Sequence, residues 1–278
     1  MKKRIFSIIA LSVAFILAVY GILSVVTLHN NAFFSPDYPE IDLTKILLKD
    51  EFADEDYKTL FYQTGLGKYA IDSIKNDDDF VEIVKSFQSN FFKKHNVECV
   101  REAITTCMEY NTTENGAYTQ GFEIFQAKPG YVLIMEASHS FGWRHGHTGL
   151  VVDKNSVLEA PIIFEPTSIY GISSWTYYPN FIMLRLKDAT DEQLALIAKD
   201  AKDDLLGITY SPLAGVFNKK QGNAPKTVQC AYLVWYSFYK QGINIDKNGD
   251  SIVTVQNIKN SDMFEVVQIY GYNPSLFM

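Results

Sequence analysis

The chain has 278 residues, of which 47% are hydrophobic, and a formal net charge of −7 at pH 7. This length and apolar content suit one large or two small globular domains and exclude a largely disordered chain. The acidic balance argues against a nucleic-acid partner, because a phosphate-binding face needs clustered basic residues and the only such cluster is Lys2, Lys3 and Arg4.

An uncharged, apolar stretch over residues 5–28 follows this basic cluster. It exceeds the ~20 residues that cross a bilayer as a helix, and it is too long for an ordinary signal-peptide core. We therefore expect residues 1–29 to be an uncleaved signal anchor, with the basic cluster in the cytoplasm and the rest of the chain outside the cell membrane. A removed signal peptide, which would give a secreted protein, is the alternative. Residues 30–41 contain two prolines and predict a linker.

A helical pattern runs from residue 42 to about residue 110 and predicts a helical accessory subdomain over residues 42–115. The segment Thr64-Gly65-Leu66-Gly67 interrupts it. The clearest predicted helix begins after Asp77-Asp78-Asp79. Its apolar residues recur at three- and four-residue spacing, as an amphipathic helix requires: Phe80, Ile83, Val84, Phe87 and Phe91.

The pattern changes after residue 115, and residues 116–278 predict an α+β domain with an antiparallel sheet. Short apolar runs bounded by turn residues predict strands over residues 131–135, 147–152, 157–160 and 181–186. A helix is predicted next, with Thr190 as N-cap, Gln193 completing a capping box and Gly207 as the stop. Its expected apolar stripe is Leu194, Ile197, Ala198, Ala201 and Leu205.

The chain has three cysteines, and their grouping suggests different roles. Cys99 and Cys107 are close in sequence and could form a disulfide outside the cell, which would leave Cys230 unpaired. Cys230 follows a polar loop over residues 218–226 and opens an apolar helix, where the helix dipole favours a thiolate and backbone N–H groups could hold an oxyanion. Burial of all three cysteines as apolar residues is the alternative.

Three histidines lie close together in the sequence, and we expect His147 to be the functional one. It opens a predicted strand, so the sheet could fix it while its imidazole faces a cleft. His139 and His145 fall in an expected loop, where an exposed histidine without a role is the ordinary case. A metal site formed by the three histidines has little support, because no thiol or carboxylate lies at ligand spacing. No metal or other cofactor is expected.

Glu159 is an acid between apolar residues in a predicted strand, and the register of its hairpin decides whether it reaches His147. A two-residue turn at Lys154-Asn155 would put the two side chains on opposite faces. A three-residue loop, with Asn155 in the left-handed conformation, would place Glu159 opposite Gly149 and on the face of His147. We predict this second register; a solvent-facing edge-strand glutamate is the alternative.

In chain order, His147, Glu159 and Cys230 and the segments around them resemble the permuted NlpC/P60 hydrolases of the YiiX/YebB-like type, whose fold is papain-like. The resemblance covers roughly residues 128–246, and in this group the histidine precedes the cysteine, as His147 precedes Cys230. Ala231 and Tyr131 depart from the usual serine and aspartate, which leaves the specificity of the pocket open. The matching blocks are residues 129–133, 147–152, 157–160, 205–210, 230–235 and 242–246.

The resemblance implies a Cys-His-Glu triad with Cys230 as nucleophile, His147 as base and Glu159 as the orienting acid. Tyr210 matches a tyrosine that would line the pocket or hold the oxyanion, although an aromatic core residue is equally consistent. An extracytoplasmic amidase or endopeptidase acting on peptidoglycan stem peptides is the expected function. A lipid-directed acyl hydrolase or acyltransferase of the same fold, and a non-catalytic cell-envelope binding module, are the alternatives.

Overall fold

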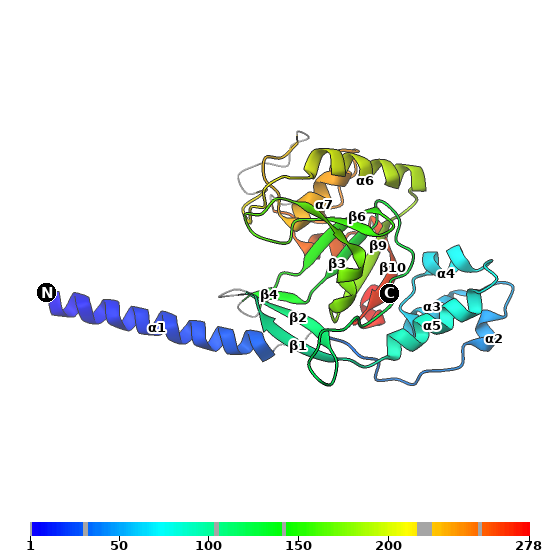
Figure 1. Ribbon diagram of the computed structural model, residues 1–278, viewed down its shortest axis with the longest axis horizontal. Coiled ribbons are helices and arrows are strands. Elements are labelled where there is room, and N and C mark those ends of the chain that lie inside the picture. The colour runs from blue at the N-terminus through cyan, green and yellow to red at the C-terminus, as the bar shows by residue number, and fades with distance from the viewer. Residues whose placement is uncertain (1, 30–32, 103–105, 141–142, 216–223, 250–251) are drawn as a thin grey trace.

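A computed structural model describes residues 2–29, 33–102, 106–140, 143–215, 224–249 and 252–278. Its first helix, α1 (Lys2–His29), projects from the globular part (Figure 1). The segment Arg4–Leu23 has a mean hydropathy of 2.6, is 0% buried, and is long and apolar enough to cross a membrane. A membrane anchor and a signal sequence both have this character. Parts of the predicted linker (residues 30–32) and of the polar loop before Cys230 (residues 218–223) lie outside the described residues.

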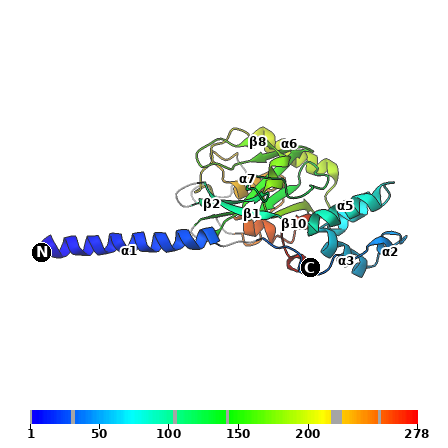
Figure 2. The same ribbon diagram turned by 60° about the horizontal axis from the view of Figure 1, so that its bottom comes forward.

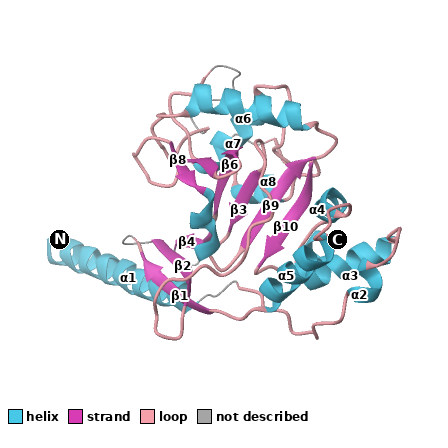
Figure 3. Cartoon of the chain, turned by 45° about the vertical axis from the view of Figure 1, so that its right-hand side comes forward, coloured by secondary structure: helices cyan, strands magenta, loops and turns pink. Residues whose placement is uncertain are grey.

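A six-stranded antiparallel sheet in the order β10-β9-β3-β6-β7-β8 forms the centre of the globular part (Figure 3). Four of its strands agree with the predicted ones, and the protein is α+β as expected. The first and last strands in that order, β10 and β8, were not predicted. The strands are β3 (Val132–Met135), β6 (His147–Asp153), β7 (Ser156–Glu159), β8 (Ser168–Gly171), β9 (Phe181–Leu186) and β10 (Phe264–Tyr270).

Two helices, α6 (Asp191–Leu205) and α7 (Cys230–Tyr239), pack against β6 and against each other. The predicted capping box of α6 is present: Thr190 Oγ1 accepts from Gln193 N at 3.2 Å, and Gln193 Oε1 accepts from Thr190 N at 2.9 Å. All five residues of its predicted apolar stripe are buried. Shorter helices complete this part: α8 (Val255–Lys259) and the 3-10 turns η1 (Ile172–Tyr177) and η2 (Pro274–Phe277).

Four helices precede the sheet in the chain: α2 (Thr44–Leu47), α3 (Asp54–Thr64), α4 (Lys68–Ile74) and α5 (Phe80–Phe92). The predicted break is present, because Gly65 has a φ of 71° and ends α3. The backbone of this break is joined to β10: Gly67 N donates to Val267 O at 2.9 Å, and Ile269 N donates to Gly65 O at 2.8 Å. These helices are therefore attached to the edge of the large sheet.

The helical prediction is wrong for residues 96–101 and 106–112, which form the antiparallel strands β1 (Asn96–Arg101) and β2 (Thr106–Thr112) of a hairpin. Burial alternates along β2, as in a strand with one covered face. With β4 (Ser138–Ser140) and β5 (Trp143–Arg144), the hairpin makes a second sheet in the order β1-β2-β4-β5. This small sheet combines strands from both sides of the predicted boundary at residue 115, and α1 ends beside it (Figures 1 and 2).

Candidate active site

The hairpin of β6 and β7 places Glu159 opposite Gly149, the register that was predicted. Leu150 pairs with Leu158 and Val151 with Val157, but the next pair is Asp153 with Ser156. The loop is therefore a two-residue turn, and Asn155 is not in the left-handed conformation that was expected. A β-bulge between Val151 and Asp153 adds one residue to β6 and shifts the register back. Turn and bulge together bring Glu159 onto the face of His147.

Cys230 is the first residue of α7, as its position after a polar loop predicted. Gln229 is the N-cap: its Oε1 accepts from Ala231 N at 2.8 Å, and its Nε2 donates to Val253 O at 2.6 Å. The first turn of α7 is thus fixed to the loop before α8, and the helix dipole points its positive end at the thiol. Because the Ala231 N–H is bonded to Gln229, it is not available to an oxyanion.

The structure brings the three residues of the expected triad into one buried cluster. The Nε2 atom of His147 lies 2.8 Å from Glu159 Oε2, and the Cys230 side chain is close enough to the imidazole to act on its pKa. The thiol itself donates to Gln229 Oε1 at 3.7 Å. Since Nε2 faces the carboxylate, Nδ1 is the ring nitrogen left for the thiol. Cys230 and His147 each keep 8% of their surface exposed, and Glu159 keeps 6%. The cluster is therefore shielded from water, but a small part of it reaches the surface.

Burial of His147 opposes a charge on its ring. The hydrogen bonds and charges of Cys230 and Glu159 outweigh this and raise the pKa of His147 to about 10. The imidazole is then protonated at neutral pH, and an imidazolium beside a sulfur favours the thiolate.

Trp175, in η1, contacts both partners of this ion pair and was missed in the sequence. Its Nε1–H donates to Glu159 Oε1 at 3.0 Å, so the two carboxylate oxygens serve two different donors. Its ring stacks on that of His147, with centroids 5.5 Å apart and planes at 19°. The only signal in the sequence was an isolated tryptophan in a polar stretch after a strand.

Gly149 lies on β6 between His147 and Glu159, and no larger residue fits there. A Cβ at this position would lie 2.6 Å from Val157 Cγ1, 3.0 Å from Glu159 Cγ and 3.3 Å from Trp175 Cζ2. Because Gly149 has no side chain, the Glu159 carboxylate can pass over it and reach His147.

Tyr210 is half-buried and lies near the nucleophile. Its backbone pairs with Val228, two residues before Cys230, and Ser211 N donates to Val228 O at 2.7 Å. Burial and the nearby thiol of Cys230 raise the pKa of the Tyr210 hydroxyl well above its usual value. A neutral hydroxyl at this place can donate a hydrogen bond.

His139 and the two other cysteines belong to the small sheet, and His145 is half-buried in the loop between β5 and β6. His139 is fully buried on β4, which corrects the expected exposed loop; its Nε2 lies 3.6 Å from Cys99 Sγ and 3.6 Å from Glu109 Oε1. Cys99 and Cys107 are free thiols, and burial raises the pKa of Cys99 to about 12. Among the described residues, no group of three or more His, Cys, Asp or Glu side chains could hold a metal ion.

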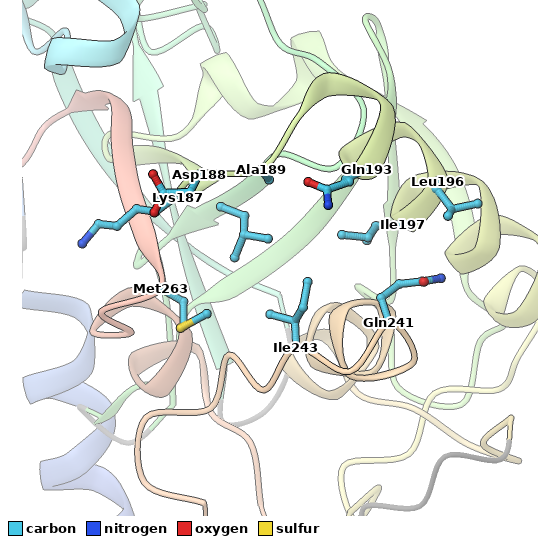
Figure 4. A pocket seen from close by; sticks show the side chains of 10 residues that line it. Lys187, Asp188, Ala189, Gln193, Leu196, Ile197, Gln241, Ile243 and Met263 are labelled. Carbon is cyan, nitrogen blue, oxygen red and sulfur yellow. The ribbon is translucent and has the colours of Figure 1, made fainter.

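A pocket of about 420 Å³ opens at the opposite end of α7 (Figure 4). It is lined by apolar and amide side chains, among them Gln193, Leu196, Gln241 and Ile243. A helix rises ~1.5 Å per residue, so the length of α7 separates this pocket from the thiol. The pocket is not part of the candidate active site.

No protein-family model matches the chain, and no curated protein matches it in sequence. Among solved structures, the chain is similar to the crystal structure of the metalloprotein yiiX from Escherichia coli O157:H7, with 16% sequence identity and a TM-score of 0.40. The match covers 51% of this chain and 97% of that chain.

Proposed function

We propose that the protein is a cysteine hydrolase in which Cys230, His147 and Glu159 form the catalytic triad. The observation that carries this proposal is the meeting of a thiol at a helix N-terminus with an imidazole that a buried carboxylate holds at 2.8 Å. The three residues come from three separate elements, α7, β6 and β7. A nucleophile, a base and an orienting group in contact are the signature of covalent catalysis.

The proposed reaction is acyl transfer to sulfur. The thiolate of Cys230 attacks a carbonyl carbon, and the imidazolium of His147 gives its proton to the leaving amine as the bond to the acyl group breaks. His147, now neutral, takes a proton from a water molecule that attacks the thioester, and the acid and the free thiol are released. Glu159 and Trp175 keep the ring in place throughout. In this proposal the Tyr210 hydroxyl donates to the oxyanion.

In the proposed fold assignment, the large sheet with α6 and α7 is a permuted papain-like domain. The chain order supports it, because the histidine strand β6 precedes the cysteine helix α7. We further propose that α1 anchors the protein in the cell membrane with the domain outside. An enzyme held there meets cell-wall peptides, so the proposed substrates are the stem peptides of peptidoglycan.

Lipid acyl groups are a second candidate substrate class. Three exposed apolar residues, Ile162, Ile163 and Phe164, follow the β-strand that carries Glu159. An apolar surface that directly follows the strand of the proposed triad acid favours an acyl-chain substrate over a polar peptide. The chemistry at Cys230 would be the same, with an alcohol in place of the amine as the leaving group.

The test compares products from purified stem peptides and from phospholipid vesicles incubated with the full chain. We expect acyl or amide cleavage by the wild type and none by Cys230→Ala or His147→Ala. The matched control is Cys107→Ala, which removes another buried thiol from the small sheet and should keep the activity. Iodoacetamide should alkylate Cys230 faster than a model thiol, and more slowly in His147→Ala. Slow alkylation without either product would contradict the proposal and favour a binding module.

A further inference from the structure

The loop between β7 and β8 exposes a run of large apolar side chains. Ile162 is 56% exposed, Ile163 51% and Phe164 77%. Single exposed apolar residues are common on soluble proteins, but three in succession indicate a surface that contacts something apolar. We call residues 162–164 the apolar loop.

Hydrogen bonds hold the apolar loop in its exposed position. Glu165 N donates to Ile162 O at 3.2 Å and closes a turn, and Tyr210 N donates to Glu165 O at 2.8 Å. Within that turn Phe164 has a φ of 70°, in the left-handed region that bulky residues rarely adopt. Such a conformation persists only where the surrounding structure enforces it, and it often marks a functional site. The side chains of the loop are thus fixed outward.

The base of the apolar loop is joined to the segment that flanks the nucleophile. Glu165 is bonded to Tyr210, and the next residue of that segment, Ser211, is bonded to Val228. Leu213, on the same segment, is also exposed. A surface that the apolar loop touches would therefore lie beside the segment that leads to Cys230.

The first helix of the chain indicates which kind of surface the apolar loop contacts. α1 carries a segment long and apolar enough to cross a bilayer, and the loop between β7 and β8 reaches the side of the globular part from which α1 projects (Figures 1 and 3). Trp143, on β5 of the small sheet whose strand β1 contacts α1, is 67% exposed. Exposed tryptophans near the end of a membrane span favour the lipid headgroup region.

We propose that the apolar loop inserts into the surface of the bilayer that α1 enters and so holds the candidate active site against the membrane. Partial insertion of apolar side chains at the headgroup boundary is the usual mode of interfacial binding. The helix tethers the domain at one point, and the loop supplies a second contact that fixes its orientation. The proposal concerns membrane contact alone and is independent of the chemistry at Cys230.

The test uses the full chain reconstituted in phospholipid vesicles, with Phe164→Trp as a fluorescent probe. Lipids brominated on their acyl chains quench tryptophans that enter the membrane. We expect the emission added by Phe164→Trp, relative to the wild type, to be largely lost in brominated vesicles. If Phe164→Trp lacks the thermal transition of the wild type, Ile163→Trp takes its place.

Leu48→Trp is the matched control. Leu48 is 73% exposed and follows α2, at the end of the molecule opposite α1 (Figure 1). Its added emission should persist in brominated vesicles, because the far end of the domain does not touch the lipid. Equal quenching of the two variants, or full emission from both, would overturn the proposal and would leave the activity of the triad unaffected.

Discussion

Replacing Glu159 with glutamine should be far more costly than its small change in shape suggests. The carboxylate accepts from His147 at 2.8 Å through Oε2 and from Trp175 at 3.0 Å through Oε1. An amide has one oxygen, so its NH₂ group must face one of these two donors. A buried donor without a partner costs about 1–3 kcal/mol, and we expect the free energy of unfolding of Glu159→Gln to fall by that amount.

One arrangement avoids this loss of stability. If the imidazolium of His147 loses its Nε2 proton and keeps the one on Nδ1, its Nε2 can accept from the glutamine NH₂, but the neutral ring then offers the sulfur neither a positive charge nor a lone pair. In that case alkylation of Cys230 at neutral pH should slow by about tenfold or more, since ~1.4 kcal/mol corresponds to a factor of ten. The assays are urea unfolding and the rate of reaction with iodoacetamide.

The control is Glu265→Gln, at a carboxylate that also binds one cation but is open to water. Its Oε1 lies 2.9 Å from Arg185 Nη1, and its side chain is 31% exposed. Glu265 reaches water, and Arg185 keeps the carbonyl oxygens of Leu186 and Ala189 as acceptors, so we expect this variant to lose only about 0–1 kcal/mol. The double variant Glu159→Gln/Trp175→Phe removes one of the competing donors and should lose less than the sum of the single changes. Additive losses, or a Glu159→Gln variant that behaves like the control in both assays, would refute the reasoning.

Two further predictions concern the same site. In a carbon-edited NMR titration, the ring of His147 should stay protonated at neutral pH and lose its proton near pH 10. In Cys230→Ala the sulfur that stabilises the protonated ring is absent, so the pKa of His147 should fall. An unchanged pKa in that variant would contradict the ion pair. Gly149→Ala should destabilise the fold by about 1–3 kcal/mol in urea, because its Cβ meets Val157 at 2.6 Å. Gly171→Ala, whose Cβ would meet only the Ser173 hydroxyl at 3.7 Å, should unfold like the wild type; equal losses would argue against the steric explanation.

Local patterns in the sequence predicted the elements that have strong periodicity or caps. The helix after Asp77-Asp78-Asp79, the capping box at Thr190 and the start of a helix at Cys230 are all present. Each of these signals lies within a few neighbouring residues, so no knowledge of the tertiary structure is needed to recognise it. The proximity of His147 and Glu159 could be inferred for the same reason, because one hairpin contains both.

What could not be predicted depends on contacts between distant segments. The hairpin at residues 96–112 mixes charged, polar and β-branched residues, and its partner strand β4 follows much later in the chain. The role of Trp175 depends on η1 folding back over the hairpin of β6 and β7, which no local pattern indicates. The expected turn conformation at Asn155 was wrong because a bulge elsewhere in the hairpin sets the register.

That bulge constrains how the sequence can change over evolution. Side chains alternate between the two faces of a strand, so the number of residues between His147 and Glu159 decides which face the acid occupies. Insertion or deletion of one residue in the turn would rotate Glu159 away from the imidazole, although every residue of the triad would still be present. Length changes in this hairpin should be tolerated only in compensating pairs, one in the turn and one at the bulge.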